Sequence, residues 1–313
     1  SQGRSVRQLN SKIRIGLSGT PMNKAEDLWN ILTWLRVEKR NFYQFKNRYC
    51  IMGGFNGYKV VAYRNLDELN KELNTVMLRR KKEDVLDLPP KIYTTEHIEL
   101  TRKQRILYKE IRQGIVDNLD NILEIPNPLS CTVRLRQLTG GLFGDDNPKL
   151  ERVKDMLEEI TESGHKALIF SQWEQVTSVY KEALKAYNPA YIVGAVDPED
   201  RQKEVDRFQN DPTCKVAIGT IGAMGTGLTM TAASYVFFVD KRYWDAENKQ
   251  AEDRAHRIGT TNTVNVVSLV ATNTVDEGIE EMLRDNRALF DRVVEGKGSR
   301  VDVGEILRKI LQY

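Results

Sequence analysis

Several features that would assign the chain to a particular class of protein are scarce or missing. Its three cysteines lie far apart and form neither a CxxC pair nor a Cys/His cluster, so we expect a reducing compartment and no bound metal. No run approaches the roughly 18 consecutive apolar residues of a membrane span, and no hydrophobic signal segment opens the chain. We therefore expect an intracellular protein without a membrane partner, cytoplasmic in a bacterium or phage and nuclear in a eukaryote. The net charge of +3 is too small to indicate nucleic acid by itself.

Two motifs of nucleotide hydrolases are also missing. The phosphate-cradling pattern GxxxxGK[ST] occurs nowhere in the sequence. Its nearest match, "EGKGS" at 295–299, has Gly298 where Ser or Thr is required, and it predicts a helix end followed by a loop. The acidic stretch "DELN" at 67–70 follows no buried strand and predicts charge at a helix start. The chain therefore shows neither a phosphate cradle nor an acidic metal-holding motif of its own.

The second half alternates short apolar runs with helical patterns. The runs predict buried strands at 167–170, 190–193, 216–218, 235–239 and 264–270. The patterns predict helices at 148–162, 174–186, 198–210, 246–256 and 274–295. This order predicts an α/β fold, with a parallel sheet covered by helices on both faces.

The first half differs, because it is mostly helical in pattern. One strand-like run at 13–17 leads into "SGTP", and a helix is predicted at 25–36. Aromatic-rich and basic helical segments follow, and Pro89 and Pro90 end them. A further helix is predicted at 102–123.

Five stretches resemble, in order and spacing, motifs of the Swi/Snf family of helicase-like DNA translocases within helicase superfamily two. They are "LSGTPMNKAEDLW" (17–29), "MLRRKKEDVLDLPPK" (77–91), "KALIFSQW" (166–173), "GTGLTMTAA" (225–233) and "QAEDRAHRIG" (250–259). Any one of them would be weak by itself, whereas five in order exceed what chance would give. The resemblance covers about 12–270.

The resemblance implies a RecA-like sheet and three parts of the chain. Residues 1–35 would end a first RecA-like lobe, 36–125 would form a helical protrusion with the inter-lobe linker, and 126–313 would form the second lobe. In the family the P-loop and DExH motifs lie upstream of "SGTP", so we expect the chain to begin after them. The resemblance thus implies the C-terminal lobe of an ATP-dependent double-stranded DNA translocase.

The implied enzyme is a DNA-dependent ATP hydrolase in its full length, and the isolated chain is expected to be inactive. ATP and Mg²⁺ would be bound mainly by the first lobe, and the partners would be that lobe and double-stranded DNA, contacted without sequence specificity. Two alternatives stay open: a non-catalytic DNA-binding or protein-docking module, and a strand-separating helicase or restriction translocase subunit. "MLRRKKEDVLDLPPK" favours the translocase, because the other enzyme groups do not normally show it.

The stretch "QAEDRAHRIG" is the candidate catalytic segment. The spacing of Gln250, Arg254 and Arg257 places them on one face of any helix drawn through them. A guanidinium group stabilises the charge that develops on a transferring γ-phosphoryl group. By resemblance Arg257 is the arginine finger, Arg254 its catalytic partner, and Gln250 and Gly227 bind the nucleotide. Three apolar positions, each one residue after a polar one, would pack the helix on the sheet: Ala251, Ala255 and Ile258. The alternative is a surface helix whose own carboxylates neutralise the arginines: Glu247, Glu252 and Asp253.

The resemblance also assigns contacts with the DNA backbone. They fall to Ser171, Gln172, Thr220, Gly225, Thr226, Arg79 and Arg80. Glycines allow close backbone approach and small hydroxyls can bond phosphate oxygens. Gly19 and Thr20 of "SGTP" are assigned to coupling, and Thr229 stands where the family usually has Asn. For "GTG" a tight turn, and for "RRKK" a solvated helix end, remain the alternatives.

Overall fold

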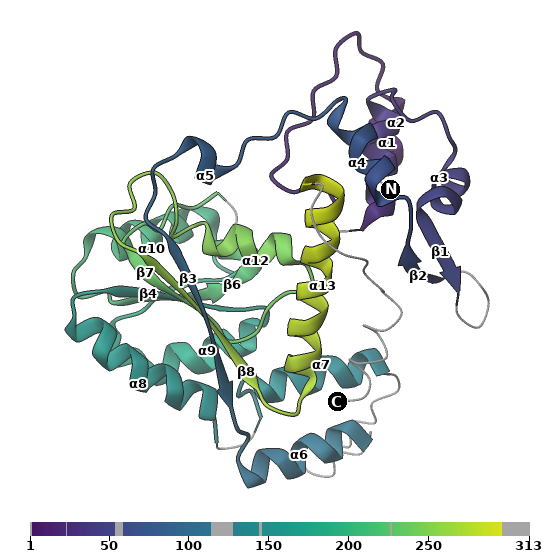
Figure 1. Cartoon of the computed structure of the whole chain (residues 1–313). Helices are drawn as coiled ribbons and strands as arrows, with labels where there is room; N and C mark the ends of the chain where they lie inside the picture. Colours follow the sequence, from purple (N-terminus) through teal and green to yellow (C-terminus); the bar gives the residue numbers. More distant parts are fainter. Residues whose placement is uncertain are drawn as a thin grey trace. The chain divides into compact units, whose positions relative to one another are not determined.

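The structure is a computed structural model of the chain, and it describes residues 2–22, 24–53, 59–113, 128–143, 146–225 and 227–295 (Figure 1). The chain divides into two compact units. Unit 1 contains Ser1–Lys81, Tyr243–Ala246 and the described part of Glu280–Gln312, and unit 2 contains Lys82–Arg242 and Glu247–Ile279. No helix among the described residues has both the length and the apolar character that a bilayer crossing requires.

Unit 2 is built on a six-stranded sheet in which all neighbouring strands are parallel. Its order across the sheet is β3 (Lys91–Ile98), β8 (Val264–Ala271), β7 (Ala233–Phe238), β4 (Lys166–Ser171), β6 (Val216–Thr220) and β5 (Ala190–Ile192). The five strands predicted in the second half are all present. The predicted parallel α/β sheet is therefore confirmed.

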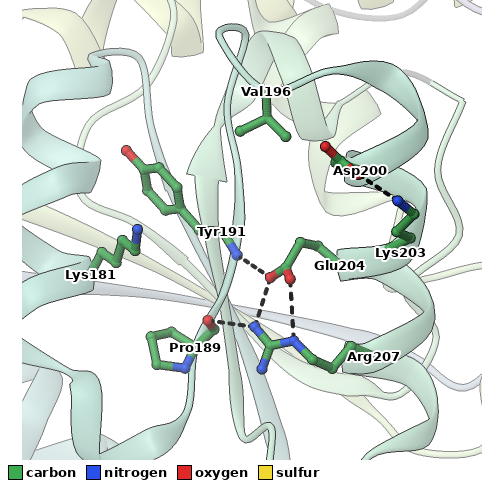
Figure 2. A pocket seen from close by; sticks show the side chains of 8 residues that line it. All are labelled: Lys181, Pro189, Tyr191, Val196, Asp200, Lys203, Glu204 and Arg207. Carbon is green, nitrogen blue, oxygen red and sulfur yellow. Dashed lines mark hydrogen bonds and ion pairs between the residues drawn. The ribbon is translucent and has the colours of Figure 1, made fainter.

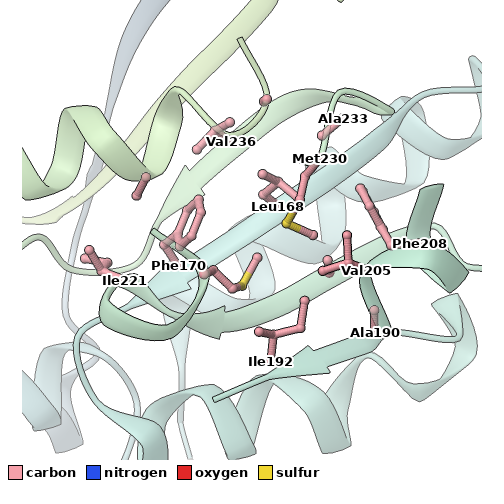
Figure 3. Close-up of a cluster of buried hydrophobic side chains, with 14 of the residues drawn as sticks. Leu168, Phe170, Ala190, Ile192, Val205, Phe208, Ile221, Met230, Ala233 and Val236 are labelled. Carbon is pink, nitrogen blue, oxygen red and sulfur yellow. The ribbon is translucent and has the colours of Figure 1, made fainter. Parts of the chain in front are cut away.

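Helices cover both faces of this sheet, because successive side chains along a buried strand point to opposite sides. In β4, Leu168 and Phe170 join a cluster that includes Phe208 (Figure 3). The intervening Ala167 and Ile169 join a second cluster on the other face. The first cluster takes residues from α10 (Pro198–Asn210), α11 (Ile221–Met224) and α12 (Asp245–Glu252), and the second from α8 (Pro148–Glu162) and α9 (Glu174–Ala183).

The ends of α8 follow from its sequence. Asn147 caps its first turn by accepting a hydrogen bond from the Leu150 amide (3.1 Å), and Pro148 occupies the first helical position. The helix ends before Gly164, whose φ of +79° belongs to the left-handed region that glycine tolerates. Its core-facing residues are spaced by three or four: Leu150, Val153, Leu157 and Ile160.

Further helices complete unit 2. They are α5 (Lys82–Val85), α6 (Arg102–Gln113), α7 (Pro128–Thr139), the 3₁₀ turn η2 (Lys185–Tyr187) and the first part of α13 (Val275–Glu295). Residues 114–123 of the helix predicted at 102–123 lie outside the described residues. The long helix predicted at 274–295 is confirmed within one residue.

Unit 1 is mostly helical, as predicted, with a core of its own. Its elements are α1 (Gln2–Gln8), η1 (Ala25–Asp27), α2 (Leu28–Trp34), α3 (Phe42–Tyr49), β1 (Cys50–Gly53), β2 (Lys59–Tyr63) and α4 (Leu66–Asn74). Leu28, Phe45 and Leu69 pack with Leu289 and Val293 from the last part of α13. The antiparallel pair β1–β2 was not predicted from the sequence.

One expectation about the first half differs from the structure. The strand predicted at 13–17 is wrong: the segment pairs with no strand among the described residues, and its apolar side chains Ile13, Ile15 and Leu17 are 73–94% exposed. A strand needs a hydrogen-bonding neighbour, which an apolar run cannot supply by itself. The two compact units divide the chain at 81/82, and β3 pairs along its length with β8 within unit 2, while the division into lobes at 125/126 stays a prediction.

A buried ion pair joins three elements of unit 2. Lys149 of α8 is fully buried, and its Nζ donates to the Asp276 Oδ2 of α13 (2.7 Å) and to the Val239 carbonyl oxygen (2.6 Å). Asp276 also accepts from the Thr139 hydroxyl (3.0 Å). Removing one member of such a pair leaves the other charge buried without compensation.

Lys149→Met is expected to lower the free energy of unfolding by about 3–5 kcal/mol, because Asp276 would lose its counter-charge. The matched control is Lys154→Met on the same helix, since Lys154 makes an exposed pair with Glu151 and should cost under about 1 kcal/mol. Urea denaturation of both variants measures the difference, and equal losses would contradict the assigned importance of the buried pair.

Candidate functional site

The segment that carries the candidate arginines is not a continuous helix. Helix α12 ends at Glu252, and residues 253–259 form turns that finish at Gly259 with φ +101°. Ala251 and Ala255 are fully buried against the sheet as predicted, whereas Ile258 is 76% exposed. The expected packing of Ile258 is therefore wrong, because helical spacing no longer holds beyond Glu252. Gln250, in the last turn of α12, is exposed.

Both arginines contact the loop that follows α11. The Arg254 Nη1 donates to the Leu228 carbonyl oxygen (3.1 Å), and its Nε donates to the Gln250 carbonyl oxygen (3.1 Å). The Arg257 Nη1 donates to the Thr229 hydroxyl (3.0 Å) and reaches the same Leu228 oxygen (3.4 Å). Two guanidinium groups from residues three positions apart thus converge on one backbone carbonyl.

Neither guanidinium is neutralised by a carboxylate of the described residues, so the surface-helix alternative does not hold. Glu252 and Asp253 instead pair with Lys91 (2.7 and 2.8 Å), and Glu247 pairs with Arg242 (2.9 Å). Burial, followed by the nearby charge of Arg257, lowers the pKa of Arg254 below its ordinary value. The site therefore holds two neighbouring positive charges, one 8% exposed and one open to solvent, and the nearby charge of Asp253 acts on Arg254 without forming an ion pair with it.

The two glycines of the loop that follows α11 occupy different environments. Gly227 is exposed with φ +75°, and a Cβ built there would meet nothing within 4 Å. Gly225 is buried, and its Cβ would lie 2.3 Å from the Ile221 carbonyl oxygen, so packing requires glycine there. Thr220 caps α11, its hydroxyl accepting from the Ala223 amide (3.4 Å). Thr226 lies outside the described residues.

Ser171 and Gln172 surround a buried carboxylate. The Ser171 hydroxyl donates to Asp240 Oδ2, and the backbone amide of Gln172 donates to Asp240 Oδ1 (2.8 Å). Arg136 donates to the Gln172 Oε1 (3.2 Å) and lies 3.6 Å from Asp240. Burial raises the pKa of Asp240, and the charge of Arg136 and the Ser171 hydroxyl only partly offset it.

Sequence reasoning missed Asp240 and Arg136. A signal for Asp240 existed, because it directly follows the apolar run 235–239 just as Ser171 follows the run 167–170. The carboxyl ends of adjacent parallel strands lie at one edge of a sheet, so the two side chains were bound to meet. The Ser171 hydroxyl consequently faces the interior.

The remaining assigned residues belong to unit 1. Gly19 and Thr20 lie exposed in a loop, where the Thr20 amide donates to the Ser18 hydroxyl (3.1 Å). The Arg79 guanidinium lies over the Phe290 ring, 5.2 Å from its centroid, and Arg80 is exposed. Of the two, Arg80 is the one presented to solvent.

A pocket of about 460 Å³ at the outer strand β5 is a separate feature (Figure 2). The Tyr191 amide donates to Glu204 Oε2 (2.9 Å), and the Arg207 Nη2 donates to the Pro189 carbonyl oxygen (2.8 Å). Glu204 and Arg207 also pair with each other (2.7 Å), as do Lys203 and Asp200. None of the residues predicted to be functional lines this pocket.

Throughout the described ranges, no cluster of three or more His, Cys, Asp or Glu side chains could hold a metal ion.

Gly225→Ala is expected to lower the free energy of unfolding by about 1–3 kcal/mol, because the new methyl group would overlap the Ile221 carbonyl oxygen. Gly194→Ala is the control, since its Cβ would meet nothing within 4 Å. Chemical denaturation of both variants tests this. An unfolding free energy unchanged by Gly225→Ala would show that packing does not require the glycine.

Two family models match the chain: the SNF2-related domain over residues 2–140 and the helicase conserved C-terminal domain over residues 148–259. Similar curated proteins include the human DNA annealing helicase and endonuclease ZRANB3, 31% identical over 92% of this chain and 27% of that protein. The TATA-binding protein-associated factor MOT1 of Saccharomyces cerevisiae is 27% identical over 95% of this chain and 20% of its own length. The chain spans about a third or less of the curated relatives that it matches.

Two solved structures are similar over nearly the whole chain. The Sulfolobus solfataricus SWI2/SNF2 ATPase core domain is 28% identical with a TM-score of 0.55, and the match covers 98% of this chain and 66% of that one. The same core in complex with double-stranded DNA gives 27% identity, a TM-score of 0.53, and coverage of 98% and 68%. The similarity confirms the RecA-like fold implied by the motifs.

Proposed function

The chain belongs to the SNF2-related, helicase-like ATPases, and from this premise we propose that it contributes the C-terminal lobe of an ATP-dependent translocase on double-stranded DNA. The observation that supports this most is that the two arginines form no ion pair with a carboxylate of the described residues. Arg254 and Arg257 keep their guanidinium groups free of carboxylates although Glu252 and Asp253 are adjacent in sequence. A structural surface segment would have no reason to separate these charges.

Arg257 is the proposed arginine finger and Arg254 its partner. A polyphosphate approaching the loop 227–230 would meet the exposed Arg257 guanidinium, whose planar fork matches phosphate oxygens. Arg254 is less exposed and is held by two backbone carbonyls, so it would fix the loop and add positive potential. Gln250 and Gly227, both exposed, would lie beside the nucleotide.

ATP would bind between this lobe and a P-loop-bearing lobe of the same protein, because this sequence contains no P-loop pattern. The donors described here fit phosphate oxygens, and the described part of the chain holds no group of three or more His, Cys, Asp or Glu side chains that could bind a metal ion. We therefore assign the metal mainly to the other lobe and assign none of its ligands here. When bound, Mg²⁺ would neutralise the charge that develops on the transferring phosphate.

Contacts with DNA would be made to its backbone and would position the lobe without reading sequence. A relative of known structure was solved with double-stranded DNA. Arg80 is the exposed arginine of the basic segment in unit 1. Gln172 directly follows β4 and Thr220 is the last residue of the neighbouring β6, both at the carboxyl edge of the sheet, and we propose that they face the same partner. Ser171 would act indirectly, because its hydroxyl is bound to Asp240.

Arg257→Ala in the whole protein is expected to reduce DNA-stimulated ATP hydrolysis about a thousandfold or more, because the transition-state charge would lose its donor. Binding of DNA should change little. A coupled ATPase assay and a DNA-binding titration measure both properties. The 313-residue chain alone should show no turnover.

The matched control is Arg102→Ala, because Arg102 is an exposed arginine on α6 and is not part of the loop 227–230. It should retain full ATPase activity. Undiminished turnover by Arg257→Ala would refute the finger, and clear turnover by the chain alone would refute the two-lobe arrangement.

Arg80→Ala is expected to weaken binding of double-stranded DNA equally for all sequences, because one phosphate contact would be lost. The slope of log K against log salt concentration should fall in magnitude by about 1. Fluorescence anisotropy at several salt concentrations measures the slope, with Arg102→Ala again as control. A slope identical to wild type would remove Arg80 from the DNA interface.

A further inference from the structure

The segment 82–91, which has a lysine at each end, binds the two acidic residues that precede the arginines. Lys91, the first residue of β3, donates from Nζ to Glu252 Oε1 (2.7 Å) and to Asp253 Oδ1 (2.8 Å). Lys82 lies 2.6 Å from the other Asp253 oxygen, Oδ2. The Tyr93 hydroxyl donates to Glu252 Oε1 (2.8 Å). Both oxygens of Asp253 are therefore occupied by lysines from the 82–91 segment.

The same segment also holds the backbone between the two arginines. The His256 Nε2 donates to the Pro89 carbonyl oxygen (2.6 Å), and Lys82 donates to the His256 carbonyl oxygen (3.3 Å). His256 lies directly before Arg257, and Asp253 directly before Arg254. Each arginine thus follows a residue that is tied to the segment 82–91.

Charge and burial make these contacts costly to break. Burial alone would lower the pKa of Lys91, but Glu252 and Asp253 raise it above its ordinary value. Burial alone would raise the pKa of Asp253, but Lys91 and Lys82 lower it below its ordinary value. Glu252 is nearly fully buried, so its carboxylate depends on Lys91 for compensation.

We propose that Lys91, assisted by Lys82, is a positioning residue for the arginine finger, because it holds the Asp253 carboxylate away from Arg254 and Arg257. Arg254 directly follows Asp253 and Arg257 lies four positions further on than Asp253, so an Asp253 released from the lysines would be attracted to these two guanidinium groups. An arginine that is paired with Asp253 could not bind the phosphate. This role rests on the proposed ATPase function and adds a second requirement to it.

Lys91→Met in the whole protein is expected to reduce kcat for DNA-stimulated ATP hydrolysis about tenfold to a hundredfold, because a small displacement of a reacting group has that cost. The KM for ATP should stay nearly unchanged, since the contact acts in the transition state. The decisive variant is Lys91→Met combined with Asp253→Asn. It should recover much of the lost kcat, because the amide no longer attracts the arginines.

Lys82→Met is the milder variant, since the Lys82 side chain is 44% exposed and folding should survive its loss. It should reduce kcat several-fold and should likewise be rescued by Asp253→Asn. Lys103→Met, an exposed lysine of α6, is the matched control and should behave as wild type. Hydrogen exchange of residues 253–260 gives a readout independent of turnover, and Lys91→Met should accelerate exchange there while β4 and β6 stay protected.

The outcomes separate the two proposals. If Arg257→Ala is inactive but Lys91→Met and Lys82→Met keep the wild-type kcat, the positioning role is overturned and the finger stands. If both lysine variants lose activity but Asp253→Asn restores none of it, the lysines act otherwise than by withholding Asp253. If Arg257→Ala is fully active, the proposed function fails together with the role that rests on it.

Discussion

The parallel sheet of unit 2 is the constraint on which the candidate site depends. A sheet buried on both faces requires apolar side chains on every strand, and β4 supplies them alternately to the two clusters. Because all six strands run in one direction, their carboxyl ends share one edge. Ser171, Thr220 and Asp240 are brought together there by topology. Polar residues after buried strands are thereby concentrated where a ligand can reach them.

The site itself depends on which charged groups pair with each other around the end of α12. Two carboxylates and two guanidinium groups lie within the six residues 252–257. On an ordinary exposed helix these opposite charges would pair with each other. The structure instead gives the carboxylates to Lys82 and Lys91 and leaves the arginines on neutral oxygens. Hydrogen bonds to carbonyl and hydroxyl oxygens orient a guanidinium without cancelling its charge. Such an arrangement suits the recognition of an anion.

The fold of the second half could be predicted because its signals are local. Apolar runs bounded by turn residues indicated five strands, and α8 and α10 were predicted with their exact ends from Pro148 and Pro198. The sixth strand, β3, was missed because "KIYTTEHI" is too polar for a buried strand, and its place at the edge beside β8 explains that composition. The run at 13–17 shows the opposite error: it is apolar enough for a strand and was predicted as one, but it pairs with no strand among the described residues.

The candidate site was predicted less completely than the fold. Motif spacing identified Arg254 and Arg257, but it assumed a helix through them and so misplaced Ile258. Their separation from Asp253 could not be read from the sequence, because it depends on Lys82 and Lys91, more than 160 residues away along the chain. Gly225 was assigned to DNA from its motif, whereas its burial gives it a packing role that spacing cannot reveal.

The outer strand of the sheet has one more consequence. A strand with a free edge can recruit a strand from another chain, which leads to association or aggregation. In β5 the outward amide of Tyr191 is taken by Glu204, and the preceding carbonyl of Pro189 is taken by Arg207, both from α10. The short length of β5, only three residues, leaves little else to pair. The β5 edge is thus closed to β-augmentation by α10, and a partner protein must recognise this edge through side chains instead of an added strand, whereas β3 forms the other edge of the sheet.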